Sequence, residues 1–235
     1  MIVLPSDEAY HAVRVLRLNT GEEVAVVDGQ GRWYRVVVEV VGRKNLVGRI
    51  LEKKADVGEP TYHLTIGLSL LKNMSRYETF VEKAVEFGVS RIIPLVAKRS
   101  ERSRMKSTRF EKILISAMKH SGRSRKVILD PPIKLKKLPK LLGDQGSDFR
   151  GVCHEMSSPT VALRNHVNAN GLPGRAIILV GPEGGFTEDE IESLEGRGFR
   201  QLYLGQRRLR AETAALAVAS AFLLAENSGR TAESF

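Results

Sequence analysis

The sequence predicts an α/β protein in two parts, and three observations support this prediction. Short runs of β-branched residues separated by glycine turns fill residues 24–51, which is typical of a small antiparallel β-barrel or sheet. A polar stretch that ends at Pro60 then breaks both the strand and the helix periodicity. Beyond it, strand patterns alternate with helix patterns, as in a mostly parallel sheet covered by helices. We therefore expect a β domain over residues 1–60 and an α/β domain over residues 61–235.

The first strand and helix of the α/β domain are read from their apolar periods. Leu64, Ile66 and Leu68 alternate with smaller or polar residues, and this period of two predicts a strand. Apolar residues then recur at helical spacing from Tyr77 until Gly88, which is expected to end the helix.

The remaining elements follow in the same alternation. Residues 91–96 predict the next strand, and Thr108-x-x-Glu111 has the spacing of a capping box that opens a second helix. Further strands are expected at residues 126–129, 149–153, 176–180 and 201–204, and a last helix at about residues 212–226.

Composition narrows the class of protein. Cys153 is the one cysteine and has no partner for an intramolecular disulfide, and the first residues lack the basic and apolar regions of a secretory leader. We therefore expect a protein of the reducing cytoplasm. The longest apolar run, residues 214–225, is 12 residues long. About 20 are needed to cross a bilayer, so no membrane segment is expected.

Several common chemistries are excluded because their motifs are missing. The sequence has no G-x-x-x-x-G-K-[ST], no G-x-S-x-G, and no third glycine after Gly29-Gln-Gly31, which argues against a P-loop, a serine nucleophile elbow and a dinucleotide fingerprint. His154-Glu155 is not followed by a second histidine four residues on, and one cysteine with 5 scattered histidines makes no zinc cluster. No metal is expected.

The positive charge is concentrated in one stretch. The chain carries a formal charge of +10, and residues 98–126 alone contribute 11 basic residues against two acidic ones. A solvated surface usually mixes signs, so this stretch favours a nucleic acid as partner over a neutral exposed face. Four lysines between Lys134 and Lys140 form a second basic element, whose partner the pattern does not indicate.

A glycine-rich loop is the most informative motif. A buried strand over residues 177–180 runs into Gly181-Pro-Glu-Gly-Gly-Phe186, and Thr187-x-x-Glu190 then has the form of a capping box. Glycines at the carboxyl end of a strand let a ligand approach the backbone, where open α/β sheets bind their ligands. The first helical turn is acidic and argues against a phosphate there. The alternative is an ordinary tight turn capped by Thr187.

A second loop has a related organisation. A short strand ends near Leu204-Gly205, and arginines and Glu212 then precede an alanine-rich helix that can pack closely inside the protein or across a dimer interface. A structural ion pair between Arg210 and Glu212 is the alternative explanation of these charges.

Together the two loops resemble a known family. Gly181-Pro-Glu-Gly-Gly-Phe186, followed by Leu204-Gly-x-Arg207-x-Leu-Arg210-x-Glu-Thr-Ala214, is similar to the signature of the bacterial 16S ribosomal RNA uracil-N3 methyltransferases of the SPOUT class. Residues 71–100 resemble the middle segment of that family, and residues 11–21 with Asp28-Gly29 resemble its PUA-like RNA-binding barrel. The chain departs from the family pattern at Lys119-His120, Gln206, Arg208 and Ala211.

The resemblance implies a fold and an activity. It implies a SPOUT domain with a deep trefoil knot, preceded by a PUA-like barrel, and a homodimer with the active site near the dimer interface. It also implies methylation of N3 of a specific uridine in the 16S rRNA of the small ribosomal subunit, with S-adenosylmethionine as the methyl donor.

The resemblance also implies site residues. The expected cofactor-binding residues are Leu179, Gly181, Pro182, Gly184, Gly185, Leu204, Gly205, Leu209, Thr213 and Ala214. The expected catalytic residues are Glu183 as a base and Arg207 and Arg210 as cations that stabilise negative charge on the uracil, while Glu212 is an alternative partner that orients an arginine. The expected RNA contacts are Arg14, Arg17, Lys72, Arg99, Arg102, Arg104, Arg123 and Arg125.

Two other functions fit part of the pattern. One is a SPOUT enzyme that methylates ribose 2′-hydroxyls in RNA, which would lack the second signature run. The other is a non-catalytic ribosome-assembly factor that binds rRNA through residues 98–126 and no longer binds the cofactor.

Overall fold

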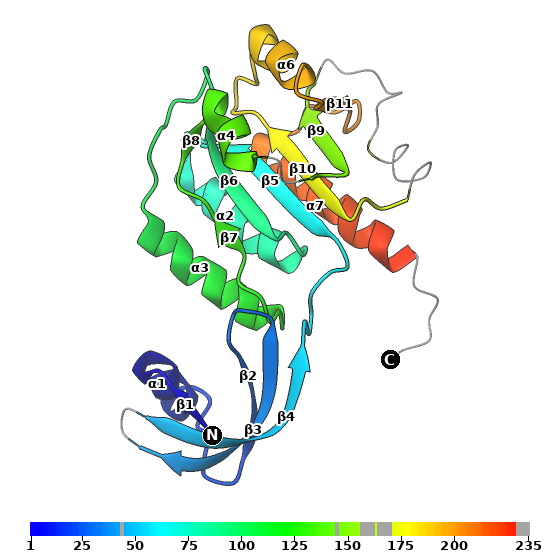
Figure 1. Ribbon diagram of the computed structural model, residues 1–235. Coiled ribbons are helices and arrows are strands. Elements are labelled where there is room, and N and C mark those ends of the chain that lie inside the picture. The colour runs from blue at the N-terminus through cyan, green and yellow to red at the C-terminus, as the bar shows by residue number, and fades with distance from the viewer. Residues whose placement is uncertain (43–44, 144–145, 156–162, 164–170, 229–235) are drawn as a thin grey trace. The chain divides into compact units, whose positions relative to one another are not determined.

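A computed structural model describes residues 1–42, 45–143, 146–155, 163 and 171–228 (Figure 1). The chain divides into two compact units. Unit 1 comprises Met1–Glu59 together with Gly122–Lys126, and unit 2 comprises Pro60–Ser121 and Val127–Phe235. The chain therefore returns to unit 1 after its first passage through unit 2. None of the described helices is long and apolar enough to cross a membrane.

Unit 1 is built on a four-stranded antiparallel sheet with the order β1-β4-β3-β2. Its elements are β1 (Ile2–Leu4), α1 (Ser6–Arg14), β2 (Glu23–Val27), β3 (Arg32–Val41) and β4 (Leu46–Ala55). Helix α1 buries Ala9 and Ala12 against Val38 and Leu46 of the sheet. The strands β2 to β4 confirm the predicted antiparallel pattern, whereas β1 and α1 were not predicted.

The returning segment is held to unit 1 by backbone hydrogen bonds. The N–H of Gly31 donates to the carbonyl of Ser124 over 3.0 Å, and the N–H of Lys126 donates to the carbonyl of Gly29 over 2.9 Å. At Gly31 a Cβ would lie 2.6 Å from the guanidinium carbon of Arg125, so the side chain of Arg125 lies directly over this glycine.

Unit 2 is built on a seven-stranded sheet in which all the described pairings are parallel. The order is β11-β9-β10-β5-β6-β7, and β8 pairs with β6. The strands are β5 (His63–Ser69), β6 (Arg91–Val96), β7 (Ile128–Leu129), β8 (Ile133–Lys134), β9 (Phe149–Cys153), β10 (Arg175–Val180) and β11 (Arg200–Leu202). The α/β fold class predicted from the sequence is confirmed.

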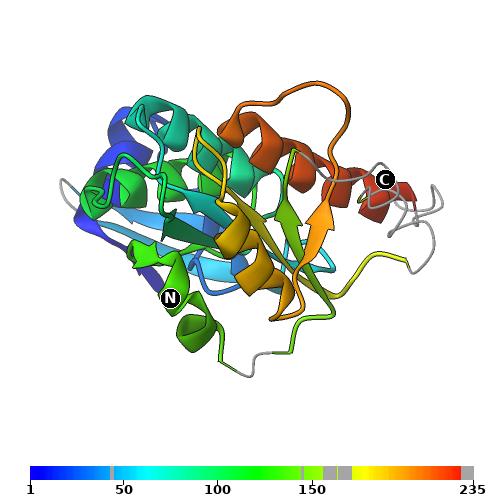
Figure 2. The same cartoon turned by 90° about the horizontal axis from the view of Figure 1, so that it is seen from above.

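Helices cover both faces of this sheet, which explains why β10 is apolar and buried from Ala176 to Val180. The helices are α2 (Met74–Glu86), α3 (Ser107–His120), η1 (Leu135–Lys137), α4 (Leu138–Leu142), α6 (Glu188–Glu195) and α7 (Ala211–Ser228). Figure 2 shows α2 and α7 on one face and α4 and α6 on the other. Leu138 of α4 and Leu194 of α6 share a core cluster with Leu179 of β10.

One predicted helix start was wrong. Helix α3 begins at Ser107 with Lys106 at its N-cap, and no side-chain capping hydrogen bond is present there. Thr108 already lies inside the first turn, so Thr108-x-x-Glu111 cannot act as a capping box, in which the threonine must precede the helix. The capping box at Thr187 is confirmed, because its side chain accepts from the N–H of Glu190 and the Glu190 side chain accepts from the N–H of Thr187.

The deep trefoil knot stays a prediction. The chain between β9 and β10 passes through residues 156–162 and 164–170, which lie outside the described residues.

Candidate functional site

Two loops leave the same edge of the unit 2 sheet, one on either side of the end of β9. Residues 181–187 follow β10, and residues 203–210 follow β11. Cys153, the last residue of β9, is the Cα partner of both Val180 in β10 and Leu202 in β11. Because the three strands are parallel, their carboxyl ends meet at one edge, where open α/β sheets bind ligands. The structure therefore brings together the two segments that the sequence singled out.

The loop after β10 is closed tightly on itself. The N–H of Gly185 donates to the carbonyl of Pro182 over 2.8 Å, and Gly185 has a φ of +68°. At Gly181 a Cβ would lie 3.0 Å from the backbone nitrogen of Phe186 and 3.1 Å from the carbonyl carbon of Gly185. Both neighbours are backbone atoms that cannot move aside easily, so a side chain at position 181 would strain the return of the loop.

Contacts from two neighbouring segments hold this loop. The carboxylate of Glu183 accepts a hydrogen bond from the N–H of Lys72 over 3.0 Å, and the guanidinium of Arg99 donates to the carbonyl of Gly184 over 2.8 Å. Arg102 in turn donates to the carbonyl of Lys72 over 2.7 Å. Four residues predicted as separate catalytic and RNA-binding groups therefore lie in one connected network around the loop.

The acidic first turn of α6 is also engaged by the basic stretch. Glu190 completes the capping box and accepts from the N–H of Lys98 over 2.8 Å. The ammonium group of Lys98 lies 3.4 Å from Asp189. Negative charge at this helix N-terminus favours a neutral or cationic ligand beside it over a phosphate.

The loop after β11 presents open backbone and exposed arginines. Gly205 has a φ of +124°, and a Cβ at this position would meet no atom within 4 Å. Arg207, Arg208 and Arg210 are exposed. Arg208 forms an exposed ion pair with Glu155 at 3.2 Å. The side chains of Arg207 and Arg210 have no partner within the described part of the chain.

Glu212 pairs with a residue of another helix. Its carboxylate lies 3.8 Å from the guanidinium of Arg76 on α2, and its side chain is 13% exposed. The structural ion pair between Arg210 and Glu212 that the sequence left open is not formed. Glu212 instead links the first turn of α7 to α2.

The residues predicted to bind the cofactor lie at different depths. Leu179 is fully buried one residue before the end of β10 and lies beneath the loop, while Pro182 is buried within it. Leu204 and Leu209 are half-buried, and Thr213 is exposed on the first turn of α7. The half-buried leucines are the ones whose apolar surface remains accessible to a ligand.

Sequence reasoning did not place Cys153 in this site. The strand period located β9, but only the pairing of β9 with both β10 and β11 brings its last residue between the two loops. Burial raises the pKa of the Cys153 thiol to about 12, so it is neutral near pH 7. A neutral thiol at this position acts as an apolar side chain and not as a nucleophile.

The predicted RNA contacts divide into exposed and buried residues. Arg14, Arg17 and Arg104 are exposed, and Arg125 is exposed but paired with Asp56 in unit 1. The pKa of Arg125 is raised by its hydrogen bond to Asp56.

Arg123 corrects the prediction for this stretch. Its side chain is 4% exposed and forms an ion pair with Glu59 at 2.7 Å inside unit 1. A cation without access to solvent cannot contact a phosphate, so Arg123 is a structural residue. The described residues contain no group of three or more side chains that could hold a metal ion.

The structure joins a small antiparallel β unit to a parallel α/β unit, and the carboxyl edge of the parallel sheet, where such folds bind ligands, carries both loops. A family model described as an RNA methyltransferase domain matches residues 58–223, and one described as an RNA methyltransferase PUA domain matches residues 4–51. The chain therefore belongs to the RNA methyltransferase family.

Individual relatives agree with this assignment. The chain is 31% identical over 211 residues to the ribosomal RNA small subunit methyltransferase E of Mesomycoplasma hyopneumoniae, covering 87% of this chain and 86% of that protein. A crystal structure of a probable rRNA-methyltransferase from Porphyromonas gingivalis is 31% identical, with a TM-score of 0.83 and coverage of 97% and 94%. The ribosomal RNA small subunit methyltransferase E of Neisseria gonorrhoeae, bound to S-adenosyl methionine, is 27% identical, with a TM-score of 0.81 and coverage of 95% and 91%.

Proposed function

We propose that this protein transfers the methyl group of S-adenosylmethionine to N3 of one uridine in the 16S rRNA of the small ribosomal subunit. The observation that carries the proposal is the pair of loops on either side of the end of β9, the second of which carries the exposed arginines Arg207 and Arg210. The Neisseria relative supports the cofactor, and the names of the relatives support the small-subunit rRNA.

Open backbone, accessible apolar surface and charge support S-adenosylmethionine as the ligand of the loops. Gly185 and Gly205 leave open space where a side chain would lie, and Leu204 and Leu209 keep apolar surface accessible. The cofactor has no phosphate, which agrees with the acidic first turn of α6. We assign the cofactor to backbone groups of residues 181–185 and 204–209, with Thr213 and Ala214 at the start of α7.

The reaction requires a positioned base and control of charge. When bound, S-adenosylmethionine supplies an electrophilic methyl group. Uracil must lose its N3 proton, and the negative charge then spreads to the ring oxygens. Arg207 and Arg210, whose side chains have no partner among the described residues, are the cations that would stabilise this charge. Glu183 uses one carboxylate oxygen for the N–H of Lys72, and its second oxygen is the candidate proton acceptor.

The RNA is expected to contact both units. Arg14 and Arg17 in unit 1, and Arg102 and Arg104 in unit 2, are exposed cations suited to phosphates. The target base must leave its stack to reach the loops. The homodimer and the cytoplasmic location remain part of the proposal, as do the knot and the division into a PUA-like unit (residues 1–60) and a SPOUT unit (residues 61–235).

The test is methylation of small ribosomal subunits from a strain that lacks the endogenous activity, followed by mass spectrometry of the nucleosides. We expect N3-methyluridine at one position. A 2′-O-methyl product would contradict the proposal and favour a ribose methyltransferase. No transfer, together with no heat on titration with S-adenosylmethionine, would identify a non-catalytic rRNA-binding factor.

A further inference from the structure

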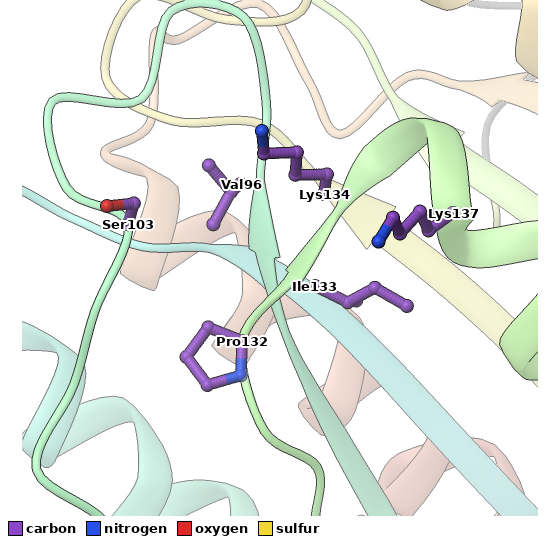
Figure 3. Close-up of a pocket in the computed structure, with 6 residues that line it drawn as sticks. All are labelled: Val96, Ser103, Pro132, Ile133, Lys134 and Lys137. Carbon is purple, nitrogen blue, oxygen red and sulfur yellow. The ribbon is translucent and has the colours of Figure 1, made fainter.

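A pocket of about 340 Å³ lies at the sheet edge that carries the two loops, away from the proposed cofactor site. It is lined by Val96, Ser103, Pro132, Ile133, Lys134 and Lys137 (Figure 3). Val96 and Lys134 are the last residues of the parallel strands β6 and β8, so the pocket opens at their carboxyl ends. Its volume falls in the range of small-ligand pockets.

Buried leucines anchor the backbone segment that carries the lysines of this pocket. Leu135 and Leu138 are 7% and 1% exposed and belong to the core cluster that covers one face of the sheet. Lys134 and Lys137, each next to one of these leucines, are exposed. Figure 3 shows their side chains extending from β8 and η1, with Ser103 on the separate loop that follows β6. The two ammonium groups are therefore presented by an anchored segment.

The charge of the pocket is uncompensated. No acidic side chain lines it, and within the described ranges the side chains of Lys134 and Lys137 form no hydrogen bond or ion pair. Val96, Pro132 and Ile133 supply an apolar wall beside the two cations. Two cations next to an apolar wall match the chemistry of a nucleotide, which combines a phosphate with a flat base.

The pocket lies within reach of the proposed reaction site but is separate from it. Strand β8 is three strand spacings from β10 through β6 and β5, or about 14 Å. The loop that carries Ser103 also carries Arg99, which holds the glycine loop at Gly184. A nucleotide in this pocket therefore cannot be the one that is methylated, but it can be a near neighbour in the same RNA strand.

We propose that this pocket binds a nucleotide that flanks the target uridine, with Lys134 and Lys137 on its phosphate and the wall of Val96, Pro132 and Ile133 against its base. The inference rests on the proposed function, because it takes RNA as the substrate. It gives the second basic element of the sequence a role, and it restricts that role to two of its four lysines.

The test compares two variants with equal loss of charge. Lys134→Gln with Lys137→Gln removes the pocket cations, and Lys136→Gln with Lys140→Gln is the matched control in the same segment. Affinity for a 16S rRNA transcript is measured without cofactor over a salt series. We expect the pocket variant to raise Kd about five- to tenfold and to reduce the salt slope by about one, and the control to change Kd less than twofold. Equal effects of the two variants would overturn the inference.

A third variant tests the shape of the pocket while its charge is kept. Ser103 is exposed, so Ser103→Phe fills the pocket without disturbing the core and keeps both lysines. It should weaken RNA binding several-fold with an unchanged salt slope. If Ser103→Phe binds RNA as tightly as the wild type, the lysines act only by general electrostatic attraction, and the proposal that the pocket binds a nucleotide is wrong.

Two further measurements show whether the pocket binds RNA or a free nucleotide, and test the proposed function separately. If UMP bound to the wild-type protein and lost its binding in the pocket variant, while RNA affinity stayed the same, a free nucleotide site would replace the proposal. Methylation of small ribosomal subunits by the wild-type protein is measured in parallel. If the wild type methylates RNA but the pocket variants bind RNA as tightly as the control variant does, the proposed function stands and only the flanking-nucleotide inference is wrong.

Discussion

The guanidinium of Arg99 donates a hydrogen bond over 2.8 Å to the carbonyl oxygen of Gly184 and joins the basic stretch to the loop that follows β10. Arg99 also packs on this glycine, because a Cβ at position 184 would lie 3.4 Å from the Cβ and Cδ of Arg99. The charge pattern predicts a phosphate contact for Arg99. In the structure Arg99 also supports the loop that we assign to the cofactor.

This contact predicts that Arg99→Ala weakens cofactor binding as well as RNA binding. A net hydrogen bond of about 0.5–1.5 kcal/mol corresponds to an increase of about two- to thirteenfold in Kd for S-adenosylmethionine, measured by calorimetry. Arg104→Ala is the matched control, because Arg104 is exposed and has no partner among the described residues. If both variants bind S-adenosylmethionine like the wild type, Arg99 does not support the loop.

Gly181→Ala is expected to distort the loop. The new methyl group would lie 3.0 Å from the backbone nitrogen of Phe186, and such overpacking destabilises a protein by about 1–3 kcal/mol. We expect a lower Tm in thermal unfolding and loss of cofactor binding. Gly146→Ala should change neither, because a Cβ at position 146 meets no atom within 4 Å. Full cofactor affinity in Gly181→Ala would show that the loop tolerates a side chain.

Arg210→Ala is expected to abolish methyl transfer while leaving the protein folded. Loss of one group that stabilises developing negative charge lowers kcat by about 10²–10³. The measurement is incorporation of labelled methyl groups into small ribosomal subunits, with circular dichroism and sedimentation as checks of folding. Arg208→Ala is the control, since Arg208 is also exposed but is paired with Glu155. Activity near that of the wild type in Arg210→Ala would remove this residue from the reaction.

The buried ion pair in unit 1 predicts a large effect on stability. The side chains of Arg123 and Glu59 are 4% and 8% exposed, so removal of one charge leaves the other buried and unpaired. Glu59→Ala should reduce the free energy of unfolding by about 3–5 kcal/mol. The double variant Glu59→Leu with Arg123→Met should be less destabilised than Glu59→Ala. A double variant that is worse than the single one would contradict this account.

The raised pKa of Cys153 predicts that the stability of the protein depends on pH. Its thiol keeps its proton up to about pH 12 in the folded protein, whereas an ordinary thiol loses it near pH 9. Above pH 9 the unfolded chain therefore binds fewer protons than the folded one, and the stability contributed by this group falls as pH rises. Cys153→Ala should flatten the loss of Tm between pH 9 and 10.5. An identical pH profile in the variant would exclude Cys153 as a cause.

The sequence predicted the elements of unit 2 better than their arrangement. The predicted bounds of β9 agree with the structure at residues 149–153, because a buried strand has a clear apolar pattern. The order β11-β9-β10 depends on pairing between distant segments, which local periodicity does not contain. For this reason the sequence identified both loops but not Cys153 between them.

The errors in the candidate site have a similar cause. The charge pattern of the basic stretch predicts one continuous surface, yet Arg123 is buried and pairs with Glu59, which lies 64 residues earlier in the chain. In the same way Glu212 pairs with Arg76 on another helix and not with its neighbour Arg210. The charge of a side chain is visible in the sequence, whereas its partner depends on the tertiary fold.

The return of Gly122–Lys126 to unit 1 has a consequence for how this protein can be divided. The chain passes between the two units three times, after residues 59, 121 and 126, so no single cut separates them. A fragment that stops at residue 60 would keep Glu59 but lose Arg123, and would also lose the backbone partners of Gly29 and Gly31. Exchange of the small unit between relatives therefore requires both of its segments to be transferred together.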